Sequence, residues 1–268
     1  MFVYTQKQII MYPIHVELNK DPRRIDMEGT ILVAHQPEFL PYLGNISKAT
    51  MGDVYFILDT VQFVKEHWQS HNKIRISASH EGWQWLIVPL KGVQKHVMMT
   101  NEVEIDGDFW KKKHLKSISL SYSRAPFFKE IFPEITGIYE RKHIMLIDFL
   151  MDIIRYAFKK FDIKAPIYQT SNLKNMGYTI EGKKSELILN MCKVVDAKTF
   201  VFGRDGRTYI EKEVFYNAGI NFVFQEFHHM EYTQIHGHFV PNMSFIDLLF
   251  NYGPESKSIL GKCDFALE

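Results

Sequence analysis

Two short apolar runs constrain the fold of this chain most strongly. A proline-rich turn and a helical stretch separate them. The first run, Thr30–His35 (TILVAH), stops at Pro37 and Pro41, and the second covers residues 54–59 (VYFILD). A strand that is buried on both faces of a sheet has a continuous apolar sequence. Two such runs within about thirty residues fit a β-α-β unit. Strand and helix signals alternate along the rest of the chain. The sequence therefore predicts an α/β fold, with a mostly parallel sheet flanked by helices and an additional α+β portion at the C-terminus.

The domain organisation follows from where the first buried strand begins. Residues 1–29 read as an N-terminal extension, because the turn-like Asp21-Pro22 sequence and several charged residues precede Thr30. Residues 30–268 are expected to form a single α/β domain, with a subdivision near residue 165 left open. A chain of 268 residues can bury a large core in either arrangement.

Composition excludes several classes of function. The 32 basic and 31 acidic side chains give a net charge of +1, which predicts no nucleic-acid partner. The two cysteines, Cys192 and Cys263, lack C-x-x-C spacing and indicate a reducing compartment. No apolar stretch is long enough for a signal peptide or a membrane span. We therefore expect a soluble cytoplasmic protein without membrane insertion.

Polar side chains occur where the two apolar runs end. His35 and Gln36 follow the first run, and Asp59 ends the second. Because α/β proteins bind ligands beyond the carboxyl ends of their strands, we expect a site there. His35 is the candidate catalytic base, with Asp59 as the carboxylate that orients it. Gln36 or Asn72 could donate hydrogen bonds to a developing oxyanion.

Other residues of this region are candidates for substrate binding. Lys48 is expected one turn into the helix, where its charge can point back toward the proline-rich turn. The stretch after Asp59 alternates polar and aromatic side chains. Its substrate-binding candidates are Gln62, Lys65, Asn72, Lys73 and Arg75. The alternative interpretation is a solvated sheet edge, where basic residues discourage edge-to-edge pairing.

A second candidate segment, residues 203–209, is a glycine-bracketed turn after a predicted strand. Its side chains Arg204, Arg207 and Tyr209 suit an anionic group such as a diphosphate. A plain surface hairpin turn is the alternative. If this turn closes on the His35 region, the two segments form a single cleft.

Histidines near the C-terminus raise the question of a metal site. An H-x-H pattern on a strand, here His236 and His238, places both rings on one face. His228 and His229 lie nearby in the sequence. A polar surface loop explains these residues better, and we predict no bound metal.

Several stretches between residues 31 and 256 carry a family resemblance. They read HQPEFLPYLGNISKA, DVYFILDTVQF, NKIRI, WLIVPL and FVPNMSFIDLLFNYGPES. On these motifs the chain resembles the WbqC-like family of bacterial proteins. The family commonly has an arginine where this chain has Ser70-His71-Asn72. If that arginine binds an anion, His71 or Lys73 must replace it here.

The resemblance implies an enzyme of surface-polysaccharide (O-antigen, lipopolysaccharide) biosynthesis that transfers an acyl or aminoacyl group onto an amino-sugar nucleotide. Its partners would be the nucleotide-sugar and an acyl- or aminoacyl-thioester donor, on coenzyme A or an acyl carrier protein. A covalent cysteine intermediate is not expected, because Cys192 lies in a predicted core helix. No G-x-S-x-G elbow is present either, so direct attack by the amine is the favoured route.

Two other functions stay open. The strand, histidine-containing turn, helix and second strand loosely match a nucleotidylyltransferase, in which a turn and a helix N-terminus hold phosphates. The paired histidines of that class and a G-K-[ST] loop are both missing. The third possibility is a non-catalytic sugar-nucleotide binding protein.

Overall fold

The computed structural model of the chain describes residues 13–20, 27–65, 67–77, 79–93, 97–261 and 264–267. Most of the predicted extension, residues 1–12 and 21–26, lies outside the described residues. The described part packs against the domain. Ile14 N donates to the Val194 carbonyl at 2.7 Å, and the Asn19 side chain donates to the Gly52 carbonyl at 2.8 Å.

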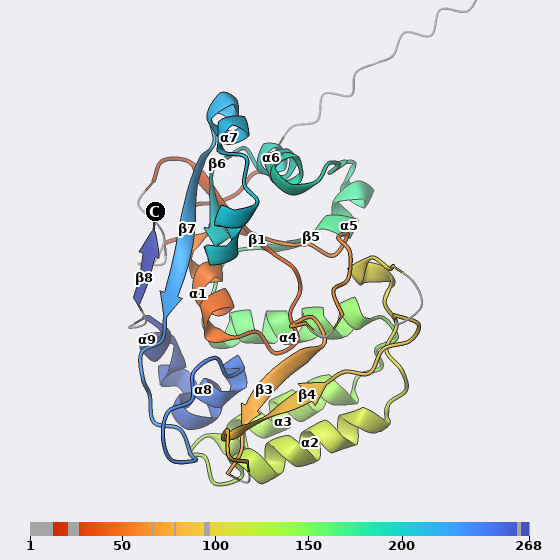
Figure 1. Cartoon of the computed structure of the whole chain (residues 1–268), viewed down its shortest axis with the longest axis vertical. Coiled ribbons are helices and arrows are strands. Elements are labelled where there is room, and N and C mark those ends of the chain that lie inside the picture. The colour runs from red at the N-terminus through yellow and green to blue at the C-terminus, as the bar shows by residue number, and fades with distance from the viewer. Residues whose placement is uncertain are drawn as a thin grey trace, which may run out of the picture.

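A six-stranded sheet in the order β5-β2-β1-β6-β7-β8 lies at the centre of the molecule (Figure 1). Five of its strands are parallel, and β8 runs antiparallel to β7 at one edge. The strands are β1 (Thr30–His35), β2 (Val54–Ile57), β5 (Ile167–Gln169), β6 (Ala197–Gly203), β7 (Asn221–His228) and β8 (Asp264–Leu267). The predicted α/β class is therefore confirmed, and strands from both sides of residue 165 share the sheet.

The predicted β-α-β unit is present as β1, helix α1 (Leu43–Met51) and β2, with β1 and β2 parallel. The chain then adds β5 beside β2, but β6 and β7 are added on the other side of β1. The direction of strand addition thus reverses between β1 and β6. In open α/β sheets this reversal leaves a crevice at the carboxyl ends of the two strands, where ligands bind.

Helices cover both faces of the sheet, and alternate residues of β1 face the two resulting cores. Ile31 and Val33 pack with α1 and the helices at residues 146–160 and 245–252, whereas Leu32 and Ala34 pack with the helices at residues 184–194 and 212–218. The helices are α2 (Phe109–Tyr122), α3 (Phe128–Glu140), α4 (Leu146–Lys160), α5 (Thr170–Leu173), α6 (Lys184–Val194), α7 (Lys212–Ala218), α8 (Phe245–Tyr252) and α9 (Ser256–Gly261). None of the helices in the described parts of the chain has the length and hydropathy that crossing a bilayer requires.

A separate two-stranded antiparallel hairpin, β3 (His71–Arg75) and β4 (Trp83–Ile87), lies below the main sheet in Figure 1. Its register pairs His71 with Ile87 and Arg75 with Trp83. One face buries Ile74 and Leu86 against the larger core. On the opposite face Trp85 and Ile87 are exposed, whereas Arg75 is buried.

Candidate functional site

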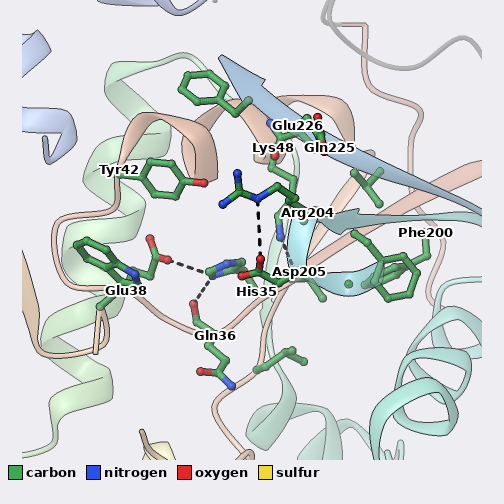
Figure 2. Close-up of a pocket in the computed structure, with 18 of the residues that line it drawn as sticks. His35, Gln36, Glu38, Tyr42, Lys48, Phe200, Arg204, Asp205, Gln225 and Glu226 are labelled. Carbon is green, nitrogen blue, oxygen red and sulfur yellow. Dashed lines mark hydrogen bonds and ion pairs between the residues drawn. The ribbon is translucent and has the colours of Figure 1, made fainter. Parts of the chain in front are cut away.

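A cavity of about 580 Å³ lies at the carboxyl edge of the sheet, where β1 and β6 are neighbours. His35 and Gln36 reach it from the end of β1, and Arg204 reaches it from the turn after β6 (Figure 2). Other polar residues of its wall include Glu38, Tyr42, Lys48, Asp205, Gln225 and Glu226. The turn after β1 and the segment at residues 203–209 therefore line the same cavity. This cavity lies at the switch point of the sheet, where the direction of strand addition reverses between β1 and β6.

The His35 ring is fixed in one tautomer by its surroundings. Nδ1 lies 2.8 Å from the Gln36 carbonyl oxygen, which can only accept, so Nδ1 carries the proton. Glu38 Oε1 lies 3.7 Å from the same nitrogen. Nε2 is then unprotonated and has no hydrogen-bond partner among the described residues. The side chain keeps 29% of its surface exposed, so Nε2 is available to a ligand in the cavity.

Burial shifts the pKa values of three groups around this ring. Burial, assisted by the Lys48 charge, lowers the pKa of His35 to about 3 and keeps the imidazole neutral. Burial raises the pKa of Glu38 to about 7 and lowers the pKa of Lys48 to about 8. Lys48 Nζ donates to the Ala34 carbonyl at 3.2 Å. A neutral base therefore lies beside a carboxyl group that titrates near pH 7.

Glu38 is the functional candidate that the sequence reasoning missed. Its Oε2 accepts a hydrogen bond of 3.0 Å from Asn45 Nδ2, and Asn45 Oδ1 accepts one of 2.9 Å from the Tyr55 hydroxyl. The carboxyl group is thus held in place from α1 and β2. A signal was present in the sequence, because a carboxylate three residues after His35 lies between two prolines that prevent a helix there.

Asp59, the expected orienting carboxylate, does not contact His35. Its Oδ1 accepts hydrogen bonds of 2.8 Å from both Thr170 Oγ1 and the Ser171 backbone amide. Gln169 Nε2 donates to Oδ2 at 3.2 Å. Asp59 is fully buried and holds the first turn of α5 against the end of β2. Glu38 occupies the position beside His35 that the sequence analysis gave to Asp59.

Asn72 also has a different place from the one expected. Its amide donates to the Phe39 and Leu40 carbonyls at 3.0 and 2.5 Å and is completely buried. Leu40 has a φ of 47°, a left-handed conformation that costs a branched residue free energy. Asn72 therefore stabilises the turn that carries Glu38 and lies outside the cavity wall.

The remaining candidates divide between the cavity and other surfaces. Among them, Gln36, Lys48, Arg204 and Tyr209 line the cavity. Gln62 and Lys65 are exposed in the loop after β2 and are not part of its wall. Lys73 lies over the ring of Trp83 on the hairpin, with 3.9 Å between Nζ and the ring centroid.

Arg75 and Arg207 are not part of the cavity wall. Arg75 is buried and donates to the Gly82, His236 and His238 carbonyls, the last at 3.1 Å. Arg207 Nη1 lies 3.1 Å from Glu226 Oε1. These contacts leave Arg204, whose side chain is 77% exposed, as the arginine at the cavity rim.

The segment at residues 203–209 is not a hairpin turn. Residues Arg204–Thr208 form a 3-10 helix, and the chain continues into α7. Gly206 lies against Phe202, where an added Cβ would come within 2.7 Å of the Phe202 Cβ atom. Glycine at this position therefore allows the turn to close tightly over the end of β6, which brings Arg204 and Tyr209 to the cavity.

The H-x-H pair does not lie on a strand. His236 and His238 belong to the loop between β7 and α8, and His236 Nε2 lies 2.7 Å from the Ser121 carbonyl oxygen. His229 Nε2 donates to Asn242 Oδ1 at 3.0 Å, whereas His228 lines the cavity. No group of three or more possible metal ligands is found among the residues that the structure describes.

The fold and the cavity define an α/β protein with a polar cavity at the topological switch point of its sheet. The family model of the WbqC-like protein family matches residues 36–259, and the chain belongs to this family. A relative from Mycobacterium tuberculosis (strain ATCC 25618 / H37Rv), "Uncharacterized protein Rv1507c", is 28% identical over 230 residues. That alignment covers 85% of this chain and 96% of the relative. No solved structure matches the chain.

Proposed function

We propose that this protein transfers an acyl or aminoacyl group from a thioester donor onto an amino-sugar nucleotide, in the synthesis of a bacterial surface polysaccharide. The observation that carries the proposal is the His35 ring in the wall of the switch-point cavity, with Nδ1 held by the Gln36 carbonyl oxygen so that Nε2 is left to accept a proton. A general base must be unprotonated to take the amine proton, and an ionised Glu38 beside Nδ1 would favour the imidazolium that then forms. The volume of about 580 Å³ falls within the usual range for small-molecule sites.

The reaction joins the sugar nitrogen to the thioester carbonyl carbon. As that C–N bond forms and the C–S bond breaks, Nε2 of His35 takes a proton from the amine and then returns it to the leaving sulfur. The products are an amide and a free thiol. Glu38, 3.7 Å from Nδ1, stabilises the transient imidazolium when its carboxyl group is ionised.

Two side chains of the cavity wall remain as donors to the tetrahedral oxyanion. Asn72, a candidate on sequence grounds, is committed to backbone carbonyls. Gln36 and Tyr42 both line the cavity. Burial raises the pKa of Tyr42 to about 12, so its hydroxyl keeps its proton at neutral pH. Arg204 at the rim suits the diphosphate of the nucleotide.

The test combines ligand binding with turnover. Nucleotide-linked amino sugars are first screened by thermal shift, because a ligand that binds the folded state raises the melting temperature. Release of free thiol from an acyl-thioester is then followed in wild type and in His35→Ala. We expect the variant to keep its thermal shift and to lose turnover by a factor on the order of a hundred or more. Near-normal thiol release by His35→Ala would refute the proposed base.

The nucleotidylyltransferase-like alternative is supported by one observation, the location of the cavity where phosphates of nucleotides bind in doubly wound sheets. In that case ATP alone would raise the melting temperature, and turnover would release pyrophosphate without any thioester. Binding of a nucleotide-sugar with no turnover in either assay would instead support the non-catalytic binding protein.

A further inference from the structure

A row of tryptophan rings covers the exposed face of the β3–β4 hairpin. Trp83 and Trp85 alternate along β4, with ring centroids 5.4 Å apart, and Trp68 lies 5.6 Å from Trp85. Lys73, opposite Trp85 in the register, places Nζ over the Trp83 and Trp85 rings at 3.9 and 5.0 Å. These four side chains are called the indole strip below.

The indole strip is continuous with the cavity. Trp68 and its neighbour His67 form part of the cavity wall, and Trp68 is also the first ring of the strip. A ligand that fills the cavity and extends past Trp68 would therefore meet Trp85 next. Trp85 keeps 42% of its surface exposed, although large aromatic side chains are normally buried.

The chemistry of the indole strip suits sugar rings. Indoles present flat, apolar, electron-rich faces, and a pyranose presents one face of C–H groups that can lie on such a ring. The hydroxyl groups at the rim of a sugar need donors and acceptors beside the aromatic face. The ammonium group of Lys73 lies over one face each of the Trp83 and Trp85 rings, where it can donate to sugar hydroxyl groups. The His71 ring packs edge-on to Trp85 with centroids 6.1 Å apart.

We propose that the indole strip is a saccharide subsite that holds sugar rings extending from the cavity, so that this protein binds a glycan chain rather than a single sugar. The proposal rests on the proposed function in one respect, that a sugar occupies the cavity. It does not depend on the reaction catalysed there. A lipid surface fits less well, because the strip begins in the wall of a cavity with charged and polar residues.

The strip contains three of the four tryptophans of the chain, and the fourth, Trp110, is buried in α2. Tryptophan fluorescence therefore reports mainly on this surface. Wild type, Trp85→Ala and Phe109→Ala are compared on an array of bacterial polysaccharides and amino-sugar oligosaccharides, and bound glycans are titrated by fluorescence. Phe109 is a matched control, because it is an aromatic residue 74% exposed on α2.

We expect wild type and Phe109→Ala to bind the same glycans, with a fluorescence change, and Trp85→Ala to bind them at least tenfold more weakly. Absence of Trp85-dependent binding across the array would overturn the subsite. Trp85-dependent binding to phosphatidylcholine–phosphatidylglycerol vesicles, without glycan binding, would also overturn it. Wild-type protein that releases no thiol from any thioester but still shows Trp85-dependent glycan binding would refute the proposed reaction and leave the subsite standing, so the two failures are distinguishable.

Discussion

At the scale of single residues, we expect the buried Glu38 carboxyl group to lower the stability of the folded protein while it supports turnover. Its pKa is raised by burial from 4.5 to about 7, so between these values the folded protein binds more protons than the unfolded chain. Stability therefore falls as pH rises through this window. Glu38→Gln removes the effect, and above pH 7 the variant should be more stable than wild type, by up to about 3 kcal/mol.

Urea unfolding at pH 4.5 and pH 8 measures this difference. The stability gain should be present at pH 8 and small at pH 4.5, where the wild-type carboxyl is protonated. The glutamine can still accept the hydrogen bond from Asn45, so the change isolates the charge. Turnover should fall in the same variant. Equal stability of the two proteins at both pH values would show that Glu38 is not desolvated.

At the scale of secondary-structure elements, Asp59 connects the end of β2 to α5. Its carboxylate accepts side-chain and backbone hydrogen bonds from residues 169–171, and all are lost in Asp59→Ala. Because unpaired buried donors cost free energy, we expect a loss of about 1–3 kcal/mol in urea unfolding. Asp59→Asn, which keeps one oxygen, should lose less.

The same variant separates the two carboxylates near the site. Below its melting temperature, Asp59→Ala should keep most of its thiol-release activity. If Asp59 oriented His35, the same variant would lose most of that activity. A loss of turnover as large as that of His35→Ala, in folded protein with an unchanged circular dichroism spectrum, would return Asp59 to the catalytic group.

The proline-rich turn between β1 and α1 shows what element-level reasoning could predict. The apolar runs and the two prolines predicted a strand, a turn and a helix at this place, and β1 and α1 are there. The partner of His35 could not be predicted from them. Two features fix the turn that carries Glu38: the left-handed conformation of Leu40 and the hydrogen bond to it from the amide of Asn72, which is distant in the sequence. Neither feature produces a local pattern in the sequence.

At the scale of the whole molecule, a buried polar cluster joins the hairpin to the C-terminal helices. Asp247 of α8 accepts hydrogen bonds from the Tyr122 and Tyr232 hydroxyls at 2.9 and 2.8 Å, and from Gln234 Nε2 at 2.9 Å. The Tyr122 hydroxyl in turn accepts from the Arg75 backbone amide. The cluster thus connects α8, α2, the hairpin and the loop after β7.

Asp247→Ala should therefore destabilise the entire fold. It leaves three buried donors without their acceptor and the buried Arg75 guanidinium without a nearby opposite charge, so we expect a loss of about 3–5 kcal/mol. Urea unfolding measures it, with the exposed Asp148→Ala on α4 as the control, expected within about 0.5 kcal/mol of wild type. A comparably small loss in Asp247→Ala would contradict this account of the cluster.

The sequence by itself determined the α/β class, the β-α-β unit and the two segments that meet at the cavity, because apolar periodicity, prolines and glycines act over a few residues. Tertiary structure decided which polar groups share the cavity. The reversal of strand order between β1 and β6 brings Arg204 to His35, which are far apart in the chain. Strand order and packing also place the Asp59 carboxylate on the first turn of α5, away from His35. They bring the Arg75 guanidinium to the carbonyls of Gly82, His236 and His238, where it is buried.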